Sequence, residues 1–310
     1  WNERIVLRLD AYREITNDLL LDITTPPSLG VSAYKENIGK LLNTGVEGTL
    51  TAFIIKKDKQ SIFWNVMVNA IHNKNEIKEI SNPLRTMNEK NDATTGTLQT
   101  RPQLRFEEGQ SVNAIWAVRS AGIDPSNGKE VYITRSGELT YNWNAADKVI
   151  VGDALANISG NLGTQFSYKG LQLSVYGSYQ LGGKLYNQTL ADRVENADIR
   201  YNVDERVLLG RWINPGDVTF FKGLRDINGN TVSTATNATS RFVQTNNFLD
   251  LESISLSYII PNRITAKWSL QNTRVGFQVN NLARISSIQV ERGLSYPFAR
   301  NFTFNLTTAF

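Results

Sequence analysis

The sequence predicts an all-β protein, a portion of a transmembrane antiparallel β-barrel, and three patterns lead to that prediction. Apolar and polar residues alternate with a period of two, over runs longer than an ordinary strand. The apolar faces of these runs carry no charge. The connections between the runs are short on one side and long on the other. A soluble β-sandwich also alternates, but unequal connections favour a barrel with an apolar outside and a polar lumen.

Eight runs show the alternation, and we expect each of them to be a strand. Leu249 and Leu251 lie in the opposite phase to Ile254 and Leu256, which predicts a β-bulge or a change of face near Glu252. The apolar positions of the eight runs are, in order, Ile5/Leu7/Leu9/Ala11, Gly48/Leu50/Ala52/Ile54, Trp64/Val66/Val68/Ala70, Leu162/Thr164/Phe166/Tyr168, Leu171/Leu173/Val175/Gly177/Tyr179, Ile254/Leu256/Tyr258, Val275/Phe277/Val279 and Phe302/Phe304/Leu306/Thr308/Phe310.

The connections fall into two classes when the last strand is taken to end in the periplasm. The turns 55–62, 168–171 and 259–273 then lie on one side, and the longer segments lie on the other. Short periplasmic turns with long extracellular loops are the arrangement of outer-membrane barrels. We therefore expect long extracellular loops at 75–158 and 181–246. Aromatic residues near the strand ends fit an interfacial girdle, although ordinary β-propensity explains them equally well.

One hairpin is predicted inside the first long loop, over residues 112–134. Its two short strands, Val112–Val118 and Glu130–Thr134, are joined by a turn in which Pro125 presets φ and Asn127-Gly128 supplies positive φ. We place this hairpin outside the membrane. Two further barrel strands remain the alternative, because they would preserve the parity of the connections.

The composition excludes several kinds of chemistry. The chain has 310 residues and no Cys, which removes disulfides, thiolate zinc sites and cysteine nucleophiles. Its single His, His72, has no marked nucleophile or orienting carboxylate, so no catalytic residue and no enzyme are expected. No apolar run is long enough for a membrane helix. Residue 1 is Trp, so we expect the native start to lie outside this chain.

Metal binding has equally weak support in the sequence. Asp226, Asn228 and Asn230 are spaced as in a calcium loop, but position 237, where the bidentate acid should stand, is Asn. A tight Asn-Gly turn is the preferred interpretation. We therefore expect no cofactor and no metal site, and leave a loop-bound calcium ion unassigned.

Several short motifs follow one another along nearly the whole chain, and each of them is weak alone. They are Tyr12-Arg13 through Asp18-Leu19-Leu20, Asn37-Ile38-Gly39-Lys40, Gly45-Val46-Glu47-Gly48-Thr49-Leu50, Trp64-Asn65 through His72-Asn73-Lys74-Asn75, Gly122-Ile123-Asp124-Pro125 through Gly128, Phe166-Ser167-Tyr168-Lys169-Gly170, Arg211-Trp212 with Pro215-Gly216-Asp217, Ile254-Ser255-Leu256-Ser257-Tyr258 with Pro261, Asn280-Asn281-Leu282 and Tyr296-Pro297. Through the order of these motifs, the chain resembles the C-terminal β-barrel portion of a SusC/RagA-type TonB-dependent outer-membrane transporter of Bacteroidota.

The resemblance implies a function as well as a fold. It implies about the last eight strands of a plugged 22-stranded barrel in the cell outer membrane, whose plug and earlier strands are absent from this chain. It further implies TonB-dependent import of a nutrient, an oligosaccharide or a peptide, together with a SusD-like surface lipoprotein that caps the barrel. A soluble or cell-surface β-rich binding or adhesion domain is the alternative.

Two sets of candidate site residues follow. Aromatic side chains in the long loops are candidates for contact with substrate or lid, since rings next to amides suit sugars and peptides, although they would equally serve to pack the loops together. These are Trp116, Tyr141, Trp143, Tyr201, Trp212 and Phe220. The alternating last strand resembles the barrel-assembly signal of outer-membrane proteins, through Phe302, Phe304, Leu306 and Phe310. An ordinary strand that ends in Phe is the alternative there.

Overall fold

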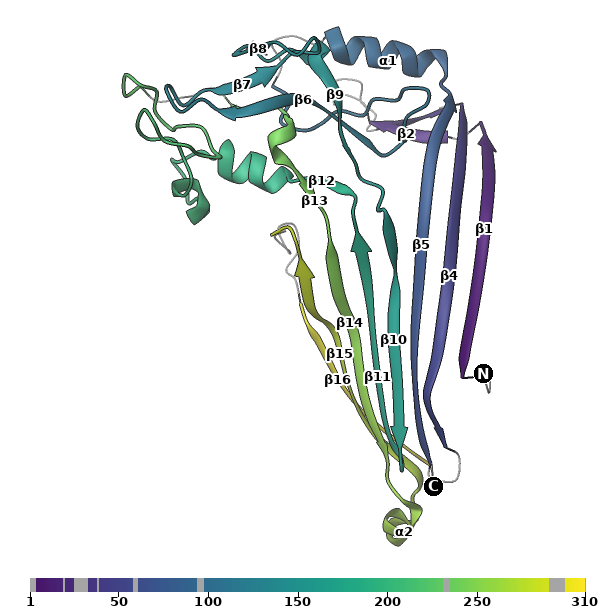
Figure 1. The fold of residues 1–310 in the computed structure, drawn as a ribbon. Coiled ribbons are helices and arrows are strands. Elements are labelled where there is room, and N and C mark those ends of the chain that lie inside the picture. The colour runs from purple at the N-terminus through teal and green to yellow at the C-terminus, as the bar shows by residue number, and fades with distance from the viewer. Residues whose placement is uncertain are drawn as a thin grey trace.

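Eight antiparallel strands form one tall, curved sheet (Figure 1). The structure is a computed structural model and describes residues 4–18, 20–24, 33–37, 39–57, 61–93, 98–230, 235–289 and 299–309. Each of the eight predicted runs lies in one strand of this sheet, which confirms the prediction. In spatial order the strands are β1 (Ile5–Asn17), β4 (Lys40–Lys57), β5 (Ile62–Glu79), β10 (Ile158–Tyr168), β11 (Leu171–Leu181), β14 (Phe248–Ile259), β15 (Gln271–Ser286) and β16 (Asn301–Ala309).

The two faces of this sheet differ in polarity, because residues that pair laterally lie on the same face. One row crosses all eight strands and carries no charge; it comprises Ile5, Ala52, Val66, Thr164, Val175, Ile254, Val279 and Phe302. A row on the opposite face is polar in six of its seven strands; it comprises Phe53, Asn65, Gln165, Ser174, Ser255, Gln278 and Thr303. Many large side chains of the apolar face are exposed, among them Leu50, Leu256 and Phe302. An exposed apolar face is unfavourable in water and suits contact with lipid.

The predicted irregularity near Glu252 is a β-bulge. Leu251 pairs with Gly177, and Ser253 pairs with Tyr176, so the register shifts across Glu252. The extra residue returns Ile254 to the apolar face that Leu251 also occupies, although the spacing of three residues would otherwise place them on opposite faces.

The two ends of the sheet have different connections, as predicted (Figure 1). At one end, which we call the turn rim, β4 joins β5, β10 joins β11 and β14 joins β15. The last of these connections contains the short helices α2 (Asn262–Thr265) and η7 (Ala266–Trp268). The other end carries the longer connections, and a folded region made of them lies above the sheet.

This folded region, which we call the loop region, contains small sheets of its own. One has four strands in the order β8 (Leu139–Thr140), β7 (Glu130–Ile133), β6 (Ala114–Ile123) and β9 (Lys148–Asp153). The pairs β12 (Lys184–Tyr186) with β13 (Val243–Thr245), and β2 (Leu20–Thr24) with β3 (Ala33–Asn37), form two more. Strands β6 and β7 form a hairpin around the predicted turn and do not belong to the eight-stranded sheet. The first strand of the hairpin differs from the one predicted, because residues 119–123 pair with β7, whereas 114–118 pair with β9. The interpretation as two more barrel strands was wrong.

The loop region also has helices that the alternation pattern does not predict. Helix α1 (Asn82–Ala93) places Pro83 in its first turn, where a missing N–H costs nothing, and packs Leu84 against Phe106 and Ile77. Its apolar content is too low for a helical period to stand out in the sequence. The remaining helical segments are η3 (Ala145–Asp147), η4 (Leu190–Glu195), η5 (Glu205–Leu208) and η6 (Ser240–Phe242).

The bounds of both long connections differ from those predicted, and the first connection ends before Ile158, which belongs to β10. Strand β5 continues to Glu79, because Asn75–Glu79 still pair with Lys40–Asn43 of β4, so the loop predicted from residue 75 begins later. Leu181 belongs to β11, so the second long connection begins after it. Among the described helices, none combines the length and the apolar character that a membrane-crossing helix needs.

Candidate functional site

The turn of the β6–β7 hairpin is the first element of the loop region that the sequence predicts in detail. The Asp124 backbone N–H donates to the Lys129 carbonyl at 2.8 Å, and the Asp124 carboxylate accepts from the Ser126 backbone N–H. Gly128 has φ of +72°, which Gly adopts without strain. These bonds hold the pKa of Asp124 below its usual value, led by the hydrogen bond from Tyr141.

Trp212 fastens this turn to the rest of the loop region. Its indole Nε1 donates to the Pro125 carbonyl at 2.8 Å, and the Gly216 backbone N–H donates to the same oxygen. The Trp212 side chain packs directly over Gly128, and only 2% of Trp212 is exposed. Asp217 closes the following turn by accepting from the backbone of Ile213 and Asn214. The R-W…P-G-D motif is therefore structural in this fold.

Arg211, the neighbour of Trp212, holds three backbone segments together. Its guanidinium donates to the carbonyls of Val207, Val194 and Lys222, the last at 3.0 Å. The Val194 carbonyl belongs to the last turn of η4, whose carbonyls lack partners within the helix. Burial lowers the pKa of Arg211, and the carboxylate of Glu195 opposes that shift.

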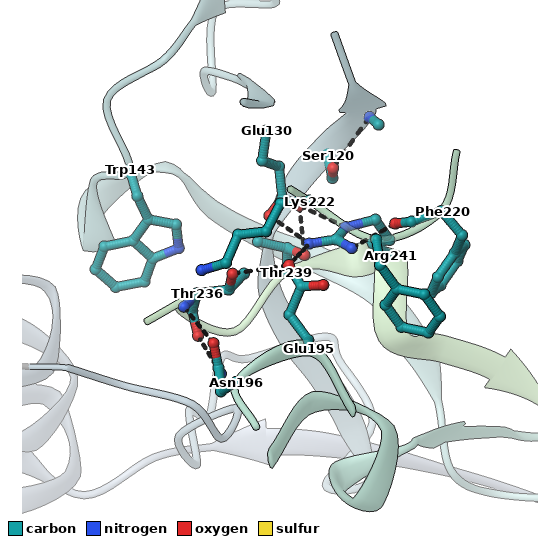
Figure 2. A network of polar contacts seen from close by, with 12 residues as sticks. Ser120, Glu130, Trp143, Glu195, Asn196, Phe220, Lys222, Thr236, Thr239 and Arg241 are labelled. Atoms are coloured by element: carbon teal, nitrogen blue, oxygen red, sulfur yellow. Dashed lines mark hydrogen bonds and ion pairs between the residues drawn. The ribbon is translucent and has the colours of Figure 1, made fainter. Parts of the chain in front are cut away.

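A buried charge network lies at the centre of the loop region (Figure 2). Arg241 forms ion pairs at 2.7 Å with both Glu130 and Glu195, and the three side chains are 4%, 3% and 0% exposed. Thr239 donates to Glu130, and Thr236 donates to Glu195. The network joins β7, η4 and the segment that leads through β13 into β14 of the large sheet.

Electrostatics explains why Arg241 stays charged in this place. Burial alone lowers the pKa of Arg241, but the charges and hydrogen bonds of Glu130 and Glu195 outweigh burial and raise it. The guanidinium also stacks over the rings of Phe242 and Phe220, at 4.6 and 5.5 Å from their centroids. Lys222 lies in the same cluster (Figure 2), where burial lowers its pKa and the two glutamates oppose that shift.

This network is the feature that sequence reasoning missed. Glu130, Glu195 and Arg241 are separated by long stretches of sequence, and no local motif marks any of them. A weak signal exists, since Arg241 follows the Thr239-Ser240 pair and precedes Phe242 in a stretch poor in other charges. The spacing alone does not reveal which carboxylates will meet it.

The structure divides the predicted aromatic contact residues into two groups. Trp116 and Trp212 are buried, and the indole of Trp143 donates to the Ala238 carbonyl, so these three rings pack the loop region. Trp116 also carries the guanidinium of Arg105 over its ring, at 5.0 Å. The exposed group comprises Tyr141, Tyr201 and Phe220. Contact with a substrate or a lid stays a prediction, and only the exposed group presents a ring for it in this structure.

Tyr201 is the most exposed of these rings, with 73% of the residue accessible. It lines a hollow of about 430 Å³ together with Arg193, Asn202 and the acids Asp192, Asp198 and Asp204. Two of these acids are paired, because Arg200 holds Asp198 and Arg206 holds Asp204. The paired arginines lower the pKa of both carboxyls to about 2, so they stay ionised at any ordinary pH. The hollow offers an aromatic ring, an amide and fixed charges.

The last strand presents the residues of the predicted assembly signal. Phe302, Phe304 and Leu306 are all exposed on the apolar face of β16, with Phe304 accessible over 80% of its surface. Phe277 of β15 packs beside Phe304, at 4.8 Å between ring centroids. Phe310 lies outside the described residues. The signal itself stays a prediction.

The predicted Asn-Gly turn at Asp226 is present. The Asp226 carboxylate accepts from the backbone N–H groups of Asn230 and Asn228, and these bonds, led by the one from Asn230, lower its pKa. Gly229 has φ of +80°. Over the described ranges, His and acidic side chains form no group of three that could hold a metal ion. His72 lies within β5, seven residues before its end at Glu79, and its Nδ1 is 2.6 Å from the Asn157 carbonyl oxygen.

Comparison with known proteins finds relatives of this chain by sequence. No family model matches the sequence. TonB-dependent receptor P39 of Formosa agariphila is 24% identical over 335 residues, which cover 91% of this chain and 30% of the relative. TonB-dependent receptor P26 of the same organism is 24% identical and covers 100% of this chain and 31% of the relative. The chain therefore spans about a third of the length of these curated relatives.

Solved structures share the fold of this chain. A structure of the RagAB peptide transporter matches 93% of this chain and 30% of its own chain, with a TM-score of 0.71 and 20% identity. A RagAB peptide importer in a closed-closed state matches with a TM-score of 0.69 and 22% identity. The chain therefore has the fold of a part of the RagAB transporter chain, which confirms the predicted fold class.

Proposed function

We propose that this chain, a β-barrel segment of a TonB-dependent receptor of the SusC/RagA type, forms part of the wall and the loops of an outer-membrane nutrient importer. The sheet carries the observation that supports this most directly. Its apolar face is uncharged along a row that crosses all eight strands, and the opposite face is lined with amides and hydroxyls. Such a sheet fits a boundary between lipid and a solvated path.

The polar face offers a solute path without any chemical step. Gln165, Ser174, Ser255 and Gln278 follow one another across four adjacent strands. Their amides and hydroxyls form hydrogen bonds with water or with a passing solute, and none of them is a nucleophile with a marked base. The proposal accordingly assigns movement of the solute to this protein and no reaction on it.

The substrate class we propose is an oligosaccharide or a peptide. Tyr141, Tyr201 and Phe220 present exposed rings in the loop region, and the hollow at Tyr201 sets a ring beside Asn202 and Asp192. Rings next to amides and carboxylates suit sugar faces and peptide side chains. The RagAB structures that share this fold are named for a peptide transporter and importer.

The partners are part of the proposal. A SusD-like surface lipoprotein would cap the loop region, and the TonB complex would act through the part of the receptor that this chain does not contain. Exposed apolar side chains on the loop region support a lid contact, because a monomeric surface rarely exposes so many together. They include Leu208, Leu209, Ile213, Val218 and Ile227.

Growth and uptake in a strain that carries the full-length receptor test this function. Import of oligosaccharides or peptides by the wild-type strain should be lost when either the receptor or TonB is deleted. Tyr201→Ala should raise the solute concentration needed for half-maximal uptake by up to about tenfold, since an aromatic contact contributes about 0.5–1.5 kcal/mol. Leu139→Ala, an equally exposed apolar side chain of the loop region that is not among the proposed contacts, is the control and should leave uptake unchanged. Uptake that persists without TonB contradicts the proposal.

Extraction separates this proposal from a soluble or cell-surface binding domain. Leu7, Leu50, Leu256 and Phe304 are exposed on the apolar face, and a protein free in water would have to cover such a face. The full-length protein should stay with the outer membrane through salt and carbonate washes and leave it only with detergent. Release by a salt wash alone would favour the binding domain.

A further inference from the structure

The three connections of the turn rim form one continuous surface. The Lys169 backbone N–H donates to the Ser61 carbonyl at 3.2 Å, which joins the β10–β11 turn to the β4–β5 turn. The Ile259 backbone N–H donates to the Gly170 carbonyl at 2.9 Å, which joins it to the start of the β14–β15 connection. Side chains on these three connections therefore keep fixed neighbours.

This rim is basic in the part that the structure describes. Lys56, Lys169, Arg263, Lys267 and Arg274 are all exposed there, and none of them pairs with a described carboxylate. The described rim segments 53–57, 61–64, 166–172 and 258–275 include no Asp or Glu. The sequence of the β4–β5 turn adds one acid, Asp58, between two further lysines, outside the described side chains.

Aromatic residues form a band directly above the basic rim, on the apolar face. Two adjacent rows of paired residues carry Trp64, Phe166, Phe277 and Phe304 in one, and Tyr168 and Tyr258 in the other. Trp and Tyr with cationic neighbours are the side chains found where hydrocarbon meets lipid headgroups. The band therefore marks the depth at which headgroups lie beside the rim.

The α2–η7 connection extends this pattern below the band. Ile264 and Trp268 are 47% and 67% exposed, beside Arg263 and Lys267. Apolar side chains and cations on one short exposed segment suit a membrane interface, where the apolar side chain enters the acyl boundary and the charge meets phosphate. In bulk water, the exposed ring of Trp268 would make no stabilising contact.

A hollow among the three turns could receive a headgroup. It has a volume of about 350 Å³ and is lined by the polar residues Ser61, Ser167 and Gln172 together with Ile62, Phe63, Tyr168, Gly170, Leu171 and Ile259. Lys169 follows Tyr168 in the chain, and its Nζ lies 5.1 Å from the Tyr168 ring centroid. Hydroxyls and an amide among apolar side chains, with the Lys169 ammonium group over the Tyr168 ring, suit a glycerol phosphate.

We propose that the turn rim binds the phosphate headgroups of anionic phospholipid, with Lys169, Arg263 and Lys267 as the cationic contacts and Trp268 as the interfacial anchor. The occupant follows from charge complementarity and from continuity with the lipid-facing sheet. The proposal depends on the outer-membrane placement given above, and it assigns the rim to the phospholipid leaflet. It does not depend on which solute the receptor imports.

The test compares lipid selectivity in the purified full-length receptor, reconstituted in phosphatidylcholine vesicles. Spin-labelled phosphatidylglycerol and spin-labelled phosphatidylcholine report the fraction of lipid immobilised on the protein. The wild type should prefer phosphatidylglycerol. A rim variant, Lys169→Asn with Arg263→Gln and Lys267→Gln, should reduce that preference by roughly fivefold or more. Each basic group close to anionic lipid strengthens the binding of that lipid by about this factor. Asn suits the positive φ of Lys169.

A loop-region variant with the same loss of charge is the matched control. Arg101→Gln with Lys129→Gln and Arg135→Gln removes three exposed cations at the opposite end, and should leave the preference unchanged. Equal loss in both variants would mean a general effect of net charge and would overturn the assignment, as would a rim variant that keeps the preference. A rim that selects lipid A instead would belong to the other leaflet, which also overturns it.

One measurement uses only the wild-type receptor, so a folding defect of a variant cannot affect it. About 1 M salt shortens the screening length to about 3 Å and should remove most of the preference for phosphatidylglycerol. A preference that persists in high salt overturns the proposal. Nutrient uptake is measured separately, so a receptor that keeps its lipid preference but imports nothing contradicts only the proposed function.

Discussion

At the scale of single residues, the stability of the loop region depends on charged side chains that are buried together. Arg241 meets Glu130 and Glu195, and each carboxylate also accepts from a Thr hydroxyl. Removal of one member of such a group leaves the others buried without compensation, which costs more than the group contributes as a whole. This asymmetry makes the network a sensitive point of the fold.

Arg241→Met should therefore destabilise the loop region by about 3–5 kcal/mol, as expected for a buried ion pair that loses one partner. The rate of limited proteolysis within the loop region of the folded full-length receptor measures this. Arg200→Met, which breaks an exposed pair with Asp198, is the control and should not change the rate. A variant that also carries Glu130→Gln and Glu195→Gln should recover part of the loss. Equal rates for Arg241→Met and wild type would contradict the role of the network.

Two glycines test how tightly Trp212 packs on the hairpin turn. Both Gly128 and Gly137 have positive φ, at +72° and +98°, so either Ala substitution costs about 1–2 kcal/mol in backbone strain. A Cβ on Gly128 would also lie 2.5 Å from the Trp212 ring, whereas one on Gly137 would meet nothing within 4 Å. Gly128→Ala should therefore lower the midpoint of thermal unfolding of the loop region, followed by Trp fluorescence, more than Gly137→Ala does. Equal shifts would show that the ring moves aside.

At the scale of elements, each strand of the large sheet carries two faces whose roles do not interchange. Val175 and Ser174 are neighbours on β11, yet Val175 lies in the uncharged row and Ser174 in the polar row. The bulge at Glu252 preserves this assignment through β14, where a plain strand would have switched it. Alternation therefore acts as a constraint on every position between the aromatic band and the loop region.

Val175→Arg should destabilise the inserted receptor by about 2–4 kcal/mol if its site lies near the middle of the bilayer, whereas Ser174→Arg should be tolerated in the solvated interior. The yield of heat-modifiable, folded receptor in the outer membrane reports both variants in the same strain. Similar yields from the two would contradict the assignment of faces. A lower yield from Ser174→Arg than from Val175→Arg would reverse it.

At the scale of the whole molecule, the sheet is an open arc with β1 and β16 at its edges. Within the described part of the chain, each edge leaves a row of backbone N–H and C=O groups without partners, and in lipid each such group costs several kcal/mol. A stable membrane protein needs those edges paired by further strands. The described strands can supply such partners only by pairing with another copy.

Residues 1–310 expressed alone with an export signal should consequently fail to accumulate as a folded outer-membrane species. Cell fractionation and heat-modifiable migration would report this, with the full-length receptor carrying the same tag as the positive control. A folded, protease-resistant 310-residue species in the outer membrane would contradict the expectation. Its size by native electrophoresis would then show whether copies pair edge to edge.

The sequence by itself determined the eight long strands, their faces and the place of the irregularity near Glu252, which the structure shows to be a bulge. These features depend on a period of two and on local phase, which a single chain displays without its partners; Leu251 and Ile254 already show the phase change near Glu252. The turn at Asp124–Lys129 was predictable for the same reason, because Pro125 and Asn127-Gly128 restrict the backbone locally. The exposed aromatic rings of the loops could be named from the sequence, but not separated from the buried ones.

Only the tertiary structure decided which loop residues meet. The pairing of Arg241 with Glu130 and Glu195, and the packing of Trp212 on Gly128, join segments far apart in the chain, and no local pattern records those distances. The same holds for the turn rim, where three separate turns become one basic surface through the bonds at Lys169 and Ile259. Local periodicity is set by backbone geometry within one strand, whereas these sites arise from long-range packing that buries charge and side chains together.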